Sequence, residues 1–328
     1  PSVKLNGEMR LIDLHCDTLL HLQDHHERYH LKENTLCVDI EKLKQAGSIA
    51  QFFACFINMG RFQESDACSK AYEYALQMLE RGKQEVEQNV NEIALARNDA
   101  ELMENQGQGK ISAFFTIEEG GIIDGKMERL EELYQKDIRL ITPLWNWENC
   151  MGYPNSDDAS VMQRGLKPFG IEAVERMNEL GMLVDVSHLS DGGFWDVIKY
   201  SKKPVIASHS NARAVCGHRR NLSDEMIHAL AEKGGVAGIN FYPRFLNGTD
   251  AAGIDDLVRH LVHMYHIGGE EFVAMGTDFD GFDDGVNDIA HIGQMEVLYH
   301  ALKKRKFNDS QIEKFWHKNA MRVIKEVL

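Results

Sequence analysis

The chain has 328 residues, of which 43% are hydrophobic and 27% are charged, which is ordinary globular composition and excludes disordered and fibrous proteins. Thirty-six Lys and Arg residues against 51 Asp and Glu residues give a net charge of −15, so the average surface repels nucleic-acid phosphates and anionic membranes. No run approaches the roughly 18 consecutive apolar residues of a membrane span, and the first ten residues lack the pattern of a secretory signal.

Short runs rich in Val, Ile, Leu and Phe recur along the chain and alternate with segments of helical spacing. This alternation predicts parallel strands joined by crossover helices. We expect eight strands, the number that closes a (β/α)8 barrel of the TIM type, and such a barrel reaches this size as one domain. In chain order the expected strands are Leu11–Asp17, Ile49–Ile57, Ile111–Glu118, Arg139–Trp145, Leu183–His188, Pro204–His209, Gly235–Tyr242 and Phe272–Asp278.

The segments between the strands carry signals for helix starts. Residues Ile171–Leu180 have apolar side chains three or four positions apart, which predicts an amphipathic helix. Ser190 and Ser223 stand where N-caps are expected. Ser310 and Glu313 match a capping box that opens the final helix.

No linker, internal repeat or low-complexity tract divides the chain. We therefore expect residues 1–328 to form a single barrel domain. The six cysteines include no Cys-x-x-Cys pair, which is typical of reduced thiols in a cytoplasmic protein. A cytoplasmic location without a nucleic-acid or membrane partner is the expectation.

Ionisable residues end five of the expected strands. Because the carboxyl ends of all barrel strands meet at one mouth, residues far apart in the sequence become neighbours there. An apolar interior has no reason to place such groups repeatedly at one end unless an ion offsets the desolvation cost, which is several kcal/mol for an unpaired buried charge. The residues at these ends are His15, Asp17, Glu118, His188, His209 and Asp278.

The first of these ends offers a pair of metal ligands. His15 and Asp17 are two apart on a strand, so both side chains face one side while Cys16 faces the other. With the next three candidates along the chain, the mouth offers three imidazoles and two carboxylates, a set suited to zinc and comparable ions. Five ligands exceed one catalytic site, and two ions that share a bridging carboxylate fit the count. The pattern predicts two Zn²⁺ per chain.

Six motifs in one order resemble the membrane dipeptidase (renal dipeptidase) family, which belongs to the amidohydrolase-like metal-dependent barrels. The resemblance runs from about residue 10 to the terminal helix, and it implies the same barrel that the strand count predicts. The motifs are Leu-Ile-Asp-Leu-His15-Cys-Asp17, Thr-Ile-Glu118-Glu-Gly-Gly, Val-Asp-Val-Ser-His188-Leu-Ser, Pro-Val-Ile-Ala-Ser-His209-Ser, Arg219-Arg220-Asn221 and Gly-Thr-Asp278-Phe-Asp-Gly.

The resemblance also implies a division of the metal ligands. By this likeness, His15 and Asp17 hold one zinc ion. His188 and His209 hold the other, and Glu118 bridges the two ions.

Three further residues receive roles from the same resemblance. Asp278 matches the acidic residue that takes a proton from the attacking water and passes it to the leaving amine. Arg220 matches the arginine that binds the terminal carboxylate of the substrate, for which a planar guanidinium is suited. Asn221 is expected to support the same region.

The chain departs from the family pattern at two places. Where vertebrate members carry a histidine just after the fourth strand, this chain has Trp145, so stabilisation of the oxyanion is expected from zinc alone or from Asn146. The doubled acid Glu118-Glu119 leaves two candidates for the bridging ligand. Ungapped counting to Asp124 favours Glu118.

The function implied by the resemblance is hydrolysis of the peptide bond of dipeptides, including those with a D-residue at the carboxyl side. One alternative is another amidohydrolase reaction, such as hydrolysis of N-acyl amino acids or deamination, because a metal cage alone does not choose the substrate. A second alternative is a non-catalytic relative that binds a metal or a ligand. The expected partner is a small dipeptide. A homodimer is common among enzymes of this kind, but no residue pattern indicates an interface.

Overall fold

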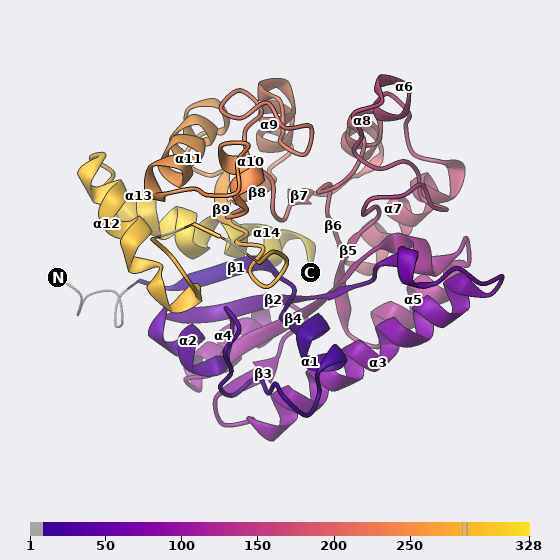
Figure 1. Ribbon diagram of the computed structural model, residues 1–328, viewed down its shortest axis with the longest axis horizontal. Helices are drawn as coiled ribbons and strands as arrows, with labels where there is room; N and C mark the ends of the chain where they lie inside the picture. Colours follow the sequence, from indigo (N-terminus) through magenta and orange to yellow (C-terminus); the bar gives the residue numbers. More distant parts are fainter. Residues whose placement is uncertain (1–8, 284, 287) are drawn as a thin grey trace.

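The computed structural model describes residues 9–283, 285–286 and 288–328, so the first part of the predicted domain, residues 1–8, lies outside the described residues. The described chain forms a nearly closed parallel barrel with helices around it (Figure 1). The strand order is β6-β5-β4-β2-β1-β9-β8-β7, and a parallel bridge between Asp185 and Ile206 joins the two ends of this order. The expected (β/α)8 fold is confirmed. The eight strands are β1 (Leu11–Cys16), β2 (Ser48–Phe56), β4 (Ile111–Glu118), β5 (Ile138–Thr142), β6 (Leu183–Val184), β7 (Ile206–Ala207), β8 (Val236–Ile239) and β9 (Val273–Met275).

One strand of the sheet was not expected. The short strand β3 (Ile93–Leu95) pairs with the first residues of β4, in parallel, and β5 pairs with the rest of β4. Three residues, of which only Ile93 is buried, carry no alternation that a sequence pattern can reveal.

Seven strands end earlier than expected, β1 and β2 by one residue and the other five by two to four, which corrects the predicted boundaries. These five strands end at Thr142, Val184, Ala207, Ile239 and Met275. His188 and Asp278 have φ angles of 70° and 62°, in the left-handed region that a strand cannot contain. The candidate site residues after β6, β7 and β9 therefore lie on the loops that follow these strands, and not on the strands themselves.

Helices lie between consecutive strands and cover the outside of the barrel (Figure 1). No described helix is both long enough and apolar enough to cross a membrane. The α-helices are α1 (Thr18–Asp24), α2 (Ile40–Gln45), α3 (Ala67–Gln88), α4 (Asp99–Gly107), α5 (Met127–Gln135), α6 (Ala159–Met162), α7 (Pro168–Leu180), α8 (Asp191–Tyr200), α9 (Asp224–Glu232), α10 (Pro243–Leu246), α11 (Ile254–Gly268), α12 (Glu296–Lys304), α13 (Asp309–Glu313) and α14 (Asn319–Val327). Three 3-10 helices, η1 (Met59–Arg61), η2 (Gly120–Ile123) and η3 (Ile292–Gln294), and a π-helix, η4 (Lys314–Lys318), complete the set.

Two of the three predicted helix caps are confirmed. The side chains of Ser190 and Ser223 accept hydrogen bonds from the backbone at the starts of α8 and α9. The capping box predicted at Ser310 is wrong. The N-cap of α13 is Asn308, which exchanges hydrogen bonds with Gln311, because an Asn-x-x-Gln pair two residues earlier forms the same reciprocal contact.

The core has two layers. An outer layer fills the space between strands and helices, and an inner cluster fills the barrel. In the inner cluster the rings of Phe52 and Phe114 stack at 4.7 Å, and Val323 and Ile324 of α14 pack against the same cluster. Apolar side chains thus occupy the barrel below the mouth, and the polar groups collect at the carboxyl ends of the strands.

Candidate metal centre

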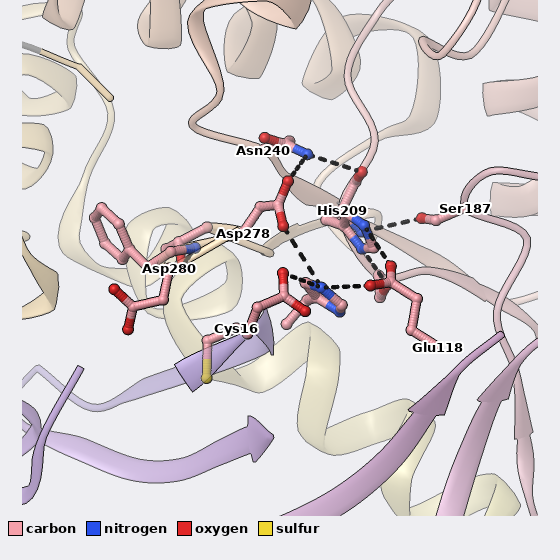
Figure 2. A network of polar contacts seen from close by, with 12 residues as sticks. Cys16, Glu118, Ser187, His209, Asn240, Asp278 and Asp280 are labelled. Carbon is pink, nitrogen blue, oxygen red and sulfur yellow. Dashed lines mark hydrogen bonds and ion pairs between the residues drawn. The ribbon is translucent and has the colours of Figure 1, made fainter. Parts of the chain in front are cut away.

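The imidazole of His15, near the end of β1, faces three carboxylates. Its Nε2 lies 3.2 Å from Oδ2 of Asp17, 3.5 Å from Oε1 of Glu118 and 3.5 Å from Oδ1 of Asp278. Asp17 lies just past the strand, yet the two side chains meet as the spacing predicted. Cys16 points away from this cluster and contacts the carbonyl oxygen of Phe52 (Figure 2).

Glu118 lies between His15 and a second pair of histidines. Its Oε2 is 3.2 Å from Nε2 of His209 (Figure 2). The same oxygen is 3.3 Å from Nε2 of His188, and the two histidine Nε2 atoms are 3.2 Å apart. The rings of His15 and His209 stack at 3.7 Å. One carboxylate thus contacts all three imidazoles.

Glu119 points elsewhere. Its Oε1 accepts a hydrogen bond from the backbone of Gly121 at 2.8 Å and another from the side-chain amide of Asn149. Its φ angle of 130° is rare for a residue with a side chain, and burial raises its pKa to about 7. Of the two neighbouring acids, Glu118 is therefore the one that reaches the histidines.

The chemistry of the cluster fits a bound cation. Two overlapping groups, His15 with Glu118 and His209, and His15 with Asp17 and Asp278, have ligand atoms within 4.8 Å of one another. Oδ1 of Asp17 is buried without a hydrogen-bond partner among the described residues. Buried carboxylates in such number need a positive charge near them, and nitrogen and oxygen ligands of this kind suit zinc and similar ions.

The second histidine pair is suited to donate lone pairs to a cation. Burial, with the nearby positive charges of Arg220 and His15, holds the pKa of His188 and of His209 well below the ordinary value. Both rings are therefore neutral at neutral pH. Neutral imidazole is the form that binds metal ions.

Asp278 follows β9 and is held from two sides. Its Oδ1 faces His15, and its Oδ2 accepts a hydrogen bond of 3.1 Å from the amide of Asn240 (Figure 2). Burial, followed by the charge of Asp17, raises the pKa of Asp278 to about 8. Without a cation the carboxyl group is therefore mostly protonated at neutral pH, and a cation bound beside it would favour the ionised form that accepts a proton.

A cavity of about 730 Å³ opens above this cluster, and Trp145, Asn146 and Arg220 are among the residues that line it. Asn221 is not among them. Its amide instead donates to the carbonyl oxygens of Cys216 and Phe245, at 2.9 and 2.8 Å. Its position fits the expected support of this region better than direct contact with a ligand.

Arg220 is almost entirely buried beside the histidines. Its Nη1 donates to Oγ of Ser210 and its Nη2 to the carbonyl oxygen of His209, both at 2.8 Å. Its Nε is buried without a partner among the described residues. The guanidinium is thus held in place by two hydrogen bonds and retains N–H groups for a ligand.

The sequence interpretation missed several residues of the site. Tyr242 and Phe56 line the cavity, and the ring of Phe56 packs edge-on against Trp145 at 4.7 Å. Asn240 donates to Asp278 from behind, and Asp185 accepts from the hydroxyl of Ser208, whose oxygen lies 2.7 Å from Nδ1 of His209. Asp185 stands in the quoted Val-Asp-Val-Ser-His motif, so its place two residues before a serine and three before a histidine was an available signal.

Comparisons with known proteins identify the family of this chain and similar folds. The model of the membrane dipeptidase family (peptidase family M19) matches residues 2–328. An uncharacterized dipeptidase of Schizosaccharomyces pombe is 30% identical over 297 residues, which cover 88% of this chain and 71% of that protein. The solved structure of the dipeptidase AC, a metallopeptidase of family M19, is similar with a TM-score of 0.89 and 26% identity over 97% of this chain and 98% of that one.

A second solved structure carries a ligand. It is a metallopeptidase from Rhodobacter sphaeroides liganded with a phosphinate mimic of the dipeptide L-Ala-D-Ala. Its TM-score is 0.88 and its identity 25%, over 98% of this chain and 99% of that one.

Proposed function

The chain belongs to the membrane dipeptidase family, peptidase family M19, and from this membership we propose that it is a binuclear zinc dipeptidase. The observation that carries the proposal is the position of Glu118, with one carboxylate oxygen toward His15 and the other toward His188 and His209. A carboxylate between two sets of ligands could contact two ions at once, which fits a two-metal site.

The five proposed ligands divide between two ions. His15 and Asp17 would hold one, His188 and His209 the other, and Glu118 would contact both. When bound, two zinc ions would lower the pKa of a water molecule and polarise the carbonyl of the scissile peptide bond.

The protein's own groups supply the remaining steps. Asp278 accepts the proton of the attacking water at Oδ1 and delivers it to the nitrogen of the leaving amine, while Asn240 holds Oδ2. Arg220 binds the carboxylate of the dipeptide with N–H groups that its two internal contacts leave free. Asn146, at the cavity wall, offers a side-chain N–H to the developing oxyanion.

We propose further that a D-residue is accepted at the carboxyl side of the substrate. The support is the similarity to the structure from Rhodobacter sphaeroides, whose ligand mimics L-Ala-D-Ala. A cavity of about 730 Å³ lies within the usual range for sites that enclose a small molecule.

The experiment compares L-Ala-L-Ala, L-Ala-D-Ala and N-acetyl-D-Ala as substrates of the zinc-loaded protein. We expect release of two free amino acids from the L,D-dipeptide, and no turnover after the metal is removed with a chelator. Ammonia as the product, or cleavage of the N-acetyl compound alone, would reject dipeptide hydrolysis in favour of another amidohydrolase reaction.

A further inference from the structure

A buried carboxylate, Asp185, lies directly after β6 and is saturated with hydrogen bonds. It accepts from the backbone N–H of Ser187 at 3.0 Å and of Ser208 at 2.8 Å. It also accepts from the hydroxyls of Ser208 at 2.5 Å and Thr142 at 2.6 Å. The side chain is fully buried. Four donors around one carboxyl group fit the ionised form, which accepts at both oxygens and donates at neither.

These contacts lie at the seam of the barrel. The strands β6 and β7 are joined there by a bridge between Asp185 and Ile206, and the backbone N–H of Val186 donates to the carbonyl oxygen of Ile206 at 2.8 Å. Above this point the side chain of Asp185 takes the place of ladder bonds and ties the loop of His209 to the loop of His188.

The hydroxyl of Ser208 connects this carboxylate to His209. Its Oγ lies 2.7 Å from Nδ1 of His209. Because the Ser208 proton is directed to Asp185, the oxygen can only accept from His209, so Nδ1 carries the ring proton. The lone pair is then on Nε2, the atom that faces Glu118 at 3.2 Å.

We propose that Asp185, acting through Ser208, is a positioning residue that fixes the tautomer and orientation of His209 for metal binding. The inference rests on the proposed function, since it concerns a ligand of the proposed zinc site. Partners of this kind behind a metal-binding histidine set the ring orientation and raise its affinity for the metal. His188 has no such partner, because its Nδ1 is buried without a hydrogen bond in the described part of the chain.

A matched pair of variants tests the link. Ser208→Ala and Thr142→Val each remove one hydroxyl donor from Asp185, but only the first breaks the path to His209. Zinc is titrated into the chelator-treated protein against a chromophoric chelator. We expect Ser208→Ala to weaken the affinity of one zinc ion about 10- to 100-fold, and Thr142→Val to leave it unchanged. Equal affinities in the two variants would overturn the inference.

Nitrogen-15 NMR of the metal-free protein gives a readout that does not depend on zinc. In the wild type we expect the His209 proton on Nδ1. In Asp185→Asn an amide N–H can donate to the oxygen of Ser208. The Ser208 hydroxyl can then donate its proton to Nδ1 of His209, and the ring proton of His209 is then expected on Nε2. A wild-type ring protonated on Nε2 contradicts the inference.

The two proposals fail in different ways. A wild-type protein that binds no zinc, with His209 protonated on Nδ1, overturns the proposed function and leaves the tautomer assignment intact. If the wild type and Ser208→Ala both bind two zinc ions with equal affinity, only the proposed role of Ser208 and Asp185 is overturned. If Asp185→Asn does not fold, the pair Ser208→Ala and Thr142→Val still decides.

Discussion

At the scale of single residues, Glu118 and Glu119 have the same side chain and opposite surroundings. Glu118 contacts three histidines, whereas Glu119 holds the backbone of Gly121 and the amide of Asn149. We therefore expect Glu118→Gln to lower dipeptidase activity more than about 100-fold and to release zinc, since loss of a ligand should cost more than loss of a partner behind one.

Glu119→Gln is the control for this prediction. It should keep two zinc ions while loosening the loop that carries Asn149. Metal content by atomic absorption and initial rates on L-Ala-D-Ala are the measurements. A Glu119→Gln protein that loses its zinc while Glu118→Gln retains it would reverse the assignment.

Arg220 permits a second prediction at this scale. Replacement by Lys keeps the charge but removes the paired N–H groups of the guanidinium. The loss of a charge-assisted hydrogen bond, about 1.5–3 kcal/mol, predicts a fall of about 10- to 100-fold in kcat/KM for dipeptides. A dipeptide amide, which lacks the carboxylate, should lose little further activity in Arg220→Lys. An unchanged KM for dipeptides in this variant would exclude the carboxylate-binding role.

The site residues differ in how far sequence could predict them. His15, Glu118 and His209 were predictable because each is an ionisable residue at the end of an apolar run, where burial is costly without an ion. Asp185 and Asn240 were not assigned, because each acts on a side chain contributed by another strand. Such contacts depend on which strand ends are neighbours and on the distances between their loops.

At the scale of elements, the strands were predictable in place and poorly predictable in length. The run Ile111–Glu118 was predicted with its observed bounds, since β2 pairs with residues 112–118 and β3 pairs with Ile111. The strands β6 and β7 have only two residues each. There the carboxylate of Asp185 replaces the backbone hydrogen bonds between the strands. The pattern of apolar residues does not show where this replacement begins.

The corrected cap of α13 gives a prediction at the same scale. Asn308 accepts from the backbone of Gln311 at 2.8 Å, whereas Ser310 lies inside the helix. Asn308→Ala should lower the free energy of unfolding by about 1 kcal/mol, and Ser310→Ala by less than about 0.5 kcal/mol. Denaturant unfolding of both variants measures the difference. A larger loss of unfolding free energy in Ser310→Ala than in Asn308→Ala would support Ser310 as the N-cap and contradict the cap at Asn308.

The helix α11 carries a histidine that should make folding sensitive to acid. Nδ1 of His260 accepts from the backbone N–H of Ala212 at 3.1 Å, and Nε2 donates to the carbonyl oxygen of Leu246 at 2.7 Å. Burial lowers the pKa of His260 from 6.5 to about 4. The unfolded chain therefore binds a proton that the folded chain does not, between these two pKa values.

This difference in bound protons sets the direction in which stability changes with pH. The contribution of His260 to the free energy of unfolding has its full value above about pH 6.5 and is lost as the pH falls toward 4. Between about pH 7.5 and about pH 5 the metal-free protein should lose about 2 kcal/mol through this group. His260→Gln should be less stable at neutral pH with a smaller loss in acid. His228→Gln, at an exposed position of α9, should retain the full loss. Equal acid sensitivity in both variants would refute the assignment.

At the scale of the whole molecule, the candidate ligands come from the ends of β1, β4, β6 and β7, which lie in different parts of the barrel order. Each of two ions held by residues from these ends is bound only by the folded chain. At a free zinc concentration 100 times Kd, such binding adds about 2.7 kcal/mol to stability. Chelation should therefore lower Tm by several degrees, as measured by calorimetry. An unchanged Tm in a protein shown to lose its zinc would contradict binding across these strands.

The most direct test of the two-ion account is a titration of the chelator-treated protein with Zn²⁺ while hydrolysis of L-Ala-D-Ala is followed. The arrangement of Glu118 between His15 and the pair His188 and His209 predicts that activity reaches its plateau at two equivalents of zinc per chain. Full activity at one equivalent, or activity that does not depend on zinc, would contradict the binuclear site.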